Sequence, residues 1–130
     1  MHERILVSLA AAVAVLLAPA ARAGEPPKKT PDLVEKGRAS FALNCAACHG
    51  AKGEGDGAAA AALNPKPRNF ATETFKHGSS VAQVFETLGK GSPGTAMIGF
   101  THLPEEERWA LAYYVLDLKS GGKAAKGAKK

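Results

Sequence analysis

The sequence predicts an all-α fold of three to five helices, joined by long ordered loops that wrap around a bound group. Apolar residues recur at helical spacing in several segments, and no stretch of the 130 residues alternates as a strand would. Glycine and proline punctuate the segments between these candidate helices. A single domain of this size buries only roughly two-thirds of its unfolded surface, so it needs stabilisation beyond its own core.

Residues 1–23 are predicted to be a cleavable secretory signal peptide. A polar start with Arg4 precedes an apolar run from Ile5 to Ala18, and the small-residue site Ala21-Arg22-Ala23 follows. The run is shorter than the ~20 apolar residues that span a bilayer, which makes an uncleaved anchor the weaker alternative. We therefore expect a soluble periplasmic protein. Cleavage leaves 15 basic and 11 acidic side chains, a formal charge of +4.

The first helix is predicted to follow an extended polar lead-in at residues 24–31, in which no packing pattern is visible. Asp32 is the expected N-cap, because Glu35 stands three residues later in capping-box order. The helix should run to about Asn44. Its apolar side is expected to comprise Leu33, Val34, Gly37, Phe41 and Leu43.

The middle of the chain is predicted to be mostly loop. Residues 50–57 are rich in glycine, residues 58–63 allow one or two helical turns, and residues 64–70 must be extended or turned because of their prolines. Ser80 and Gln83 form a second capping signature, which predicts a helix over residues 81–88 that ends at Gly89.

The last helix is predicted to begin with Pro104 at its first position and three glutamates in its first turn. It should end before Gly121 and Gly122, and its apolar residues lie around most of its circumference, so we expect it to be well covered. Residues 119–130 hold five lysines among glycines and alanines and are predicted to form a flexible tail.

The strongest functional signal is the sequence Cys45-Ala46-Ala47-Cys48-His49. The C-x-x-C-H order is the attachment sequence for c-type haem, in which two thiols form thioethers with the porphyrin vinyl groups and the histidine is the proximal iron ligand. Three alternatives fit the motif less well. A disulfide would close too small a loop to stabilise much, a thioredoxin-like pair lacks its βαβ context, and a zinc site lacks a fourth ligand at the usual spacing.

Met97 is the expected distal iron ligand. It is the one methionine left after signal removal, and it lies in a glycine-flanked loop where a core-filling role is a poor fit. Its soft thioether favours ferrous iron. His77 and His102 are the competing candidates for this position, although His77 is expected to face solvent.

Taken together, these features make the chain resemble a class I c-type cytochrome of the small bacterial type. The resemblance covers about residues 31–118, and the cytochrome c domain is predicted at residues 32–118. The resemblance implies the cytochrome c fold around one covalently bound haem. It also implies that Gly37 and Phe41 on the first helix cross the last helix closely, with Leu111 and Tyr114 as their counterparts.

The resemblance implies further residues around the haem. A proline carbonyl, from Pro65 or Pro67, would accept a hydrogen bond from the second nitrogen of His49. Arg68 would neutralise a haem propionate or is an ordinary surface arginine. Trp109 would touch a propionate or lock the helices together, and the core role is favoured.

The function predicted from these residues is that of a monomeric, mono-haem electron carrier, not an enzyme. It would shuttle electrons between periplasmic or membrane-bound redox partners, reaching the membrane only through those partners and having no role with nucleic acid. Two alternatives stay open: a gas-binding or peroxide-reducing haem protein with a labile sixth ligand, and a docked subunit of a larger oxidoreductase. Lysines expected near the haem could steer an acidic partner, namely Lys52, Lys66, Lys76 and Lys90.

Overall fold

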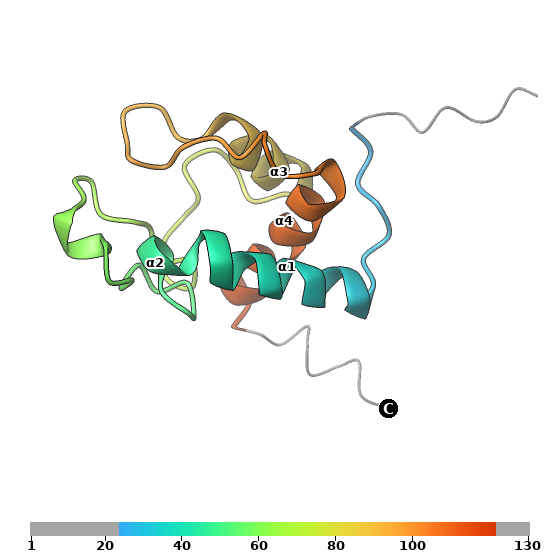
Figure 1. Cartoon of the computed structure of the whole chain (residues 1–130), viewed down its shortest axis with the longest axis horizontal. Helices are drawn as coiled ribbons and strands as arrows, with labels where there is room; N and C mark the ends of the chain where they lie inside the picture. The colour runs from blue at the N-terminus through green and yellow to red at the C-terminus, as the bar shows by residue number, and fades with distance from the viewer. Residues whose placement is uncertain (1–23, 122–130) are drawn as a thin grey trace, which may run out of the picture.

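A computed structural model describes residues 24–121, which contain four α-helices, one short 3₁₀ helix and no strand. The all-α prediction is therefore confirmed (Figure 1). The predicted signal peptide and residues 122–130 of the predicted tail lie outside the described residues. The elements are α1 (Pro31–Asn44), α2 (Ala46–His49), η1 (Ala60–Ala62), α3 (Val81–Lys90) and α4 (Glu105–Lys119).

The N-terminus of α1 corrects the prediction that Asp32 caps it. Thr30 is the N-cap, and its hydroxyl accepts a hydrogen bond from the backbone N–H of Leu33 at 3.2 Å. Pro31 explains the shift, because its fixed φ and missing N–H suit the first helical position. Asp32 instead lies in the first turn, where its charge faces the positive end of the helix dipole.

The other helix ends differ slightly from the prediction. The capping box of Ser80 and Gln83 is present, but α3 continues through Gly89 and ends at Lys90, with Gly91 as C-cap at φ 74°. Pro104 is the N-cap of α4 and not its first residue. Helix α4 also includes Lys119, whose amine donates to the carbonyl of Glu73 at 3.3 Å, so this lysine belongs to the folded domain and not to a tail.

The crossing of α1 and α4 forms the largest helix–helix contact, and Figure 1 shows α4 passing behind α1. A Cβ atom at Gly37 would collide with the backbone carbonyl of Ala110 and approach the Cβ of Tyr114. Phe41 packs on Tyr114 with ring centroids 5.3 Å apart, and Leu111 is fully buried nearby in the core. The expected close crossing is present, although the residue that faces Gly37 is Ala110 and not Leu111.

The lead-in before α1 is extended, as predicted, and it packs against α4 although its sequence shows no packing pattern. The hydroxyl of Tyr113 donates to the carbonyl of Pro27 at 2.7 Å. The amine of Lys29 forms an ion pair with the buried carboxylate of Asp117. Residues 24–30 therefore act as a strap along one side of α4.

Candidate functional site

A cavity of about 500 Å³ lies between α2, α3 and the loops that follow them. Apolar side chains form most of its wall, including Phe70, Leu88 and Val115. Cys45, Cys48, His49 and Met97, the four residues predicted to attach and ligate a haem, all line this one cavity. Its size and apolar lining are typical of a site for a small molecule or cofactor.

Helix α2 places the two cysteines and the histidine side by side. Cys45 is its N-cap, and the carbonyl of Cys45 accepts hydrogen bonds from the N–H groups of Cys48 at 3.1 Å and His49 at 2.9 Å. Both cysteines are free thiols, so the disulfide alternative is not realised. Burial, helped by the nearby Cys48, raises the pKa of the Cys45 thiol to about 12, which keeps it protonated at neutral pH.

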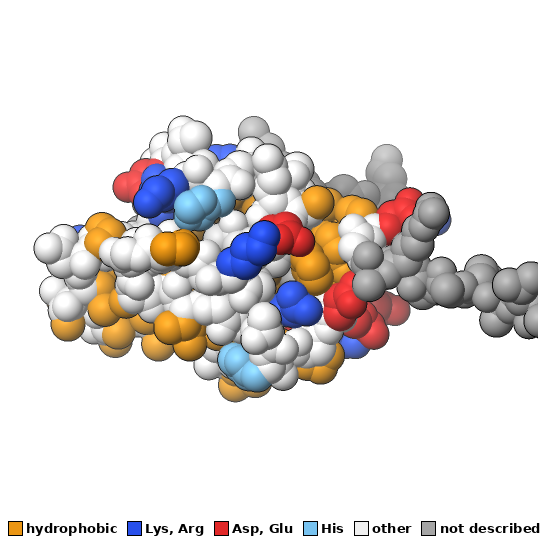
Figure 2. All heavy atoms as spheres, turned by 90° about the horizontal axis from the view of Figure 1, so that it is seen from above, with side chains coloured by type: hydrophobic (Ala, Val, Ile, Leu, Met, Phe, Trp, Pro, Cys, Tyr) orange, Lys and Arg blue, Asp and Glu red, His pale blue; other side chains and the backbone are white. Residues whose placement is uncertain are grey.

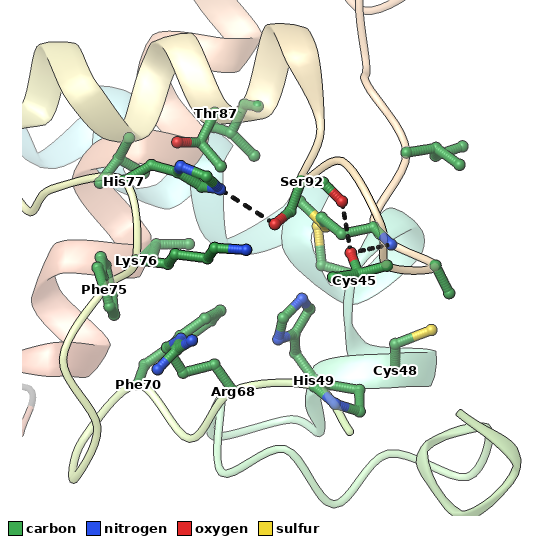
Figure 3. Close-up of a pocket in the computed structure, with 18 of the residues that line it drawn as sticks. Cys45, Cys48, His49, Arg68, Phe70, Phe75, Lys76, His77, Thr87 and Ser92 are labelled. Atoms are coloured by element: carbon green, nitrogen blue, oxygen red, sulfur yellow. Dashed lines mark hydrogen bonds between the residues drawn. The ribbon is translucent and has the colours of Figure 1, made fainter. Parts of the chain in front are cut away.

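His49 lies against the aromatic wall of the cavity. Its ring stacks on Phe70 with centroids 4.6 Å apart and an interplanar angle of 26°, and Figure 3 shows the ring projecting into the cavity beside Cys45. Burial lowers the pKa of His49, while a weaker interaction with the backbone of Arg68 raises it. The neutral imidazole that results is the form that binds a metal ion.

The Nδ1 atom of His49 is buried and has no hydrogen-bond partner within standard geometry. The expected hydrogen bond from His49 to a proline carbonyl is therefore not formed, although both Pro65 and Pro67 line the cavity. The carbonyl of Pro67 faces Gly55, where a Cβ atom would strike it. The backbone group that raises the pKa of His49 belongs to Arg68, one residue after Pro67.

The glycine-rich loop after α2 is fixed directly to the aromatic wall. The N–H of Phe70 donates to the carbonyl of Gly53 at 2.8 Å, and Gly53 has φ 72°. A Cβ atom at Gly53 would lie 2.5 Å from the Phe70 ring. Glycine is therefore required here both for the left-handed backbone and for the close approach that holds Phe70 under His49.

The remaining candidates fall in different places. His77 is exposed yet lines the cavity, whereas His102 is exposed and does not line it. The Arg68 guanidinium donates to the carbonyl of Thr74 at 2.6 Å and lies 3.6 Å from the carboxylate of Glu73, so it also braces its own loop. Lys76 lines the cavity on the side of Phe70, Phe75 and His77, away from Cys48 (Figure 3).

Trp109 has the core role that the sequence favours. It is 3% exposed, stacks on Phe85 with centroids 3.7 Å apart, and does not line the cavity. Its indole N–H lies 3.3 Å from the carboxylate of Glu105. Trp109 therefore joins α3 to α4.

The residues of the cavity fit a covalently bound haem. Two unpaired thiols, a neutral imidazole and a thioether line a mostly apolar space. The zinc alternative finds no support in residues 24–121, because no three His, Cys, Asp or Glu side chains gather there to hold a metal ion. In the same residues, none of the helices combines the length and the apolar character needed to cross a membrane.

Comparisons with known proteins agree with this chemistry. The family model described as Cytochrome c matches residues 34–119. A chain of the reducing HAO-like protein complex Kustc0457/Kustc0458 from Kuenenia stuttgartiensis is similar in structure, with a TM-score of 0.68 and 35% sequence identity. The match covers 73% of this chain and 47% of that chain, so this chain spans about half of it. A search of the curated proteins found no match.

Proposed function

This chain belongs to the cytochrome c family and carries covalently bound haem c, and from that premise we propose that it is a mono-haem electron carrier of the periplasm. When bound, the haem supplies an iron that alternates between the ferric and ferrous states. The observation that carries the proposal is that one cavity is lined by Cys45, Cys48, His49 and Met97. His49 and Met97 would both ligate the iron, which would leave no open position for a substrate and limit the haem to accepting and donating electrons.

We assign a separate role to each side chain. Cys45 and Cys48, which lie one helical turn apart, would hold the cofactor by thioethers. His49 is the proximal ligand, held by its stacking on Phe70. Met97 would be the second iron ligand, and its soft sulfur would favour the ferrous form and raise the reduction potential. Arg68 and Pro65 complete the surroundings of the cofactor at the cavity wall.

The proposed partners are redox proteins with an acidic docking surface. Two of the four lysines singled out in the sequence, Lys66 and Lys76, line the cavity. Lys52 is exposed beyond α2, whereas Lys90 pairs with Glu86 at 2.7 Å and so offers less free charge. Figure 2 shows one face on which basic side chains are scattered among acidic and neutral ones. Such charges mainly increase the rate of association and make it depend on salt.

A second candidate function is that of a docked subunit of a larger oxidoreductase. It is favoured by the structural neighbour, which is a chain of a protein complex and is longer than the part that matches. Size-exclusion chromatography of the protein from its native source separates the two. A freely diffusing carrier elutes as a monomer, whereas a subunit elutes with its complex.

Carbon monoxide binding to the reduced holoprotein tests the carrier function. We expect the spectrum of the wild type to be low-spin and unchanged by the gas, because Met97 occupies the sixth position. Met97→Ala should bind carbon monoxide fully, whereas His102→Ala, which removes an exposed histidine outside the cavity, should behave as the wild type. A wild type that takes up the gas would contradict the carrier and favour gas binding or peroxide reduction.

A further inference from the structure

The loop that carries Met97 is closed on itself by hydrogen bonds. The N–H of Ser92 donates to the carbonyl of Met97 at 2.9 Å, and the N–H of Met97 donates to the hydroxyl of Thr95 at 3.1 Å. The hydroxyl and the N–H of Thr95 both donate to the carbonyl of Ser92, at 2.7 and 3.1 Å. Residues 92–97 therefore behave as one unit, and the backbone of Ser92 takes part in three of these four hydrogen bonds.

The base of this loop is packed against the end of α3. The N–H of Phe100 donates to the carbonyl of Leu88 at 2.7 Å. A Cβ atom at Gly91 would lie 2.6 Å from the carbonyl oxygen of Met97, and one at Gly99 would collide with the carbonyl of Gly89. The two stems of the loop are thus held backbone to backbone. A movement of the Met97 backbone would therefore tilt the loop as a body about this base.

One side chain outside the loop restrains such a tilt. The Nε2 atom of His77, in the segment before α3, lies 3.1 Å from the hydroxyl of Ser92 (Figure 3). Within residues 24–121, this is the one hydrogen bond that joins residues 75–79 to residues 91–99. It reaches the loop at Ser92, where the internal bonds meet.

We propose that His77 is a positioning residue for the distal ligand: its hydrogen bond to Ser92 joins the Met97 loop to the segment before α3 and slows the departure of Met97 from the iron. This inference rests on the proposed ligation by Met97. Nothing in the family match or the structural neighbour assigns a role to His77 or Ser92.

The hydrogen bond between His77 and Ser92 does not depend on the charge of His77. A hydroxyl can both donate and accept, so Ser92 can pair with either neutral tautomer of the imidazole, and it can accept from the protonated ring. His77 therefore restrains the loop in each protonation state. For the same reason an amide side chain, which also donates and accepts, should replace the imidazole.

The test compares variants of the ferric holoprotein by the rate at which added imidazole displaces Met97. Losing the bond in His77→Ala or Ser92→Ala should speed displacement about two- to ten-fold, the range expected for one neutral hydrogen bond. The double variant should be no faster than either single variant, because both remove the same bond. His77→Gln should be close to the wild type. His102→Ala is the matched histidine control and should change nothing.

The outcomes separate this inference from the proposed function. The red absorption band of a methionine-ligated ferric haem reports directly whether Met97 is bound. If the wild type shows the band and His77→Ala displaces Met97 no faster, or if the two single effects add, the positioning role is wrong and the ligation by Met97 stands. If the wild type lacks the band, both are wrong.

Discussion

The crossing of α1 and α4 and the cavity beside α2 are both places where distant segments meet closely, but they are completed differently. At the crossing, the chain supplies every part: Gly37 admits the backbone of Ala110, and the hydroxyl of Ser40 donates to Glu107 at 2.6 Å. At the cavity, the side chains surround a space of about 500 Å³ that two free thiols, an imidazole and a thioether line.

This difference means that the two regions contribute to the small domain in different ways. The crossing depends on close packing alone, because its side chains fill the space between the helices and pair with one another. The cavity depends on a bound cofactor, because its thiols, imidazole and thioether are groups that attach and ligate a haem. Stability of the whole domain should therefore depend on the cofactor, whereas the geometry of the helices that hold it should depend on the crossing.

Removing the covalent attachment should produce the largest effect. We expect Cys45→Ala with Cys48→Ala to abolish haem staining after denaturing electrophoresis and to prevent accumulation of folded protein, because the apolar wall of the cavity would lose its covalently held filling. Ala47→Ser is the control: this side chain lies between the two cysteines and is exposed, so haem should stay attached. Undiminished haem staining of the double cysteine variant would show that the attachment lies elsewhere.

The next largest effect should come from one methyl group at the crossing. Gly37→Ala places a Cβ atom against the carbonyl of Ala110, and we expect the free energy of unfolding of the holoprotein to fall by about 2 kcal/mol, as for other overpacked sites. Guanidinium titration followed by circular dichroism measures it. The intrinsic helix preference of alanine over glycine acts in the opposite direction.

Gly89→Ala is the matched control for that measurement. Gly89 also lies within a helix, but a Cβ atom there would meet only the end of the flexible Arg108 side chain, at 3.1 Å. We expect no destabilisation, and a gain of up to about 1 kcal/mol from helix preference. Equal losses in both variants would show that the crossing of α1 and α4 is no tighter than an ordinary helix surface.

How much could be predicted from the sequence follows the same division. The three longer helices, α1, α3 and α4, could be predicted because periodicity and capping residues are local signals, and the errors stay within two residues of each end, whereas the short helix α2 is not predicted. The capping-box pattern of Asp32 and Glu35 competes with Thr30, and the preference of Pro31 for the first helical position decides in favour of Thr30. Gly37 could be identified at the crossing, but its partner Ala110 could not, since pairing across helices leaves no local signal.

The cavity could be predicted only where a motif is contiguous. The order of Cys45, Cys48 and His49 predicts haem attachment. Met97 could be predicted as the distal ligand because it is the one methionine left after removal of the signal peptide. The other walls come from segments without periodicity, so the stacking of Phe70 on His49 and the bond between His77 and Ser92 have no signal in the sequence. The sequence predicts that His77 faces solvent, and its exposure agrees, but its position at the cavity depends on how two loops meet in space.

The smallest of the three effects should come from the strap, whose packing has no signal in the sequence. Lys29 pairs with Asp117, whose side chain is only 9% exposed. Lys29→Ala leaves that carboxylate buried without its partner, and we expect a loss of about 1–2 kcal/mol in the free energy of unfolding. Lys28→Ala, at the exposed neighbouring lysine, should cost nothing measurable. Adding Asp117→Asn to Lys29→Ala should recover part of the loss, because the unpaired charge is then gone. If Lys29→Ala and Lys28→Ala unfold alike, the ion pair of Lys29 with Asp117 adds no stability.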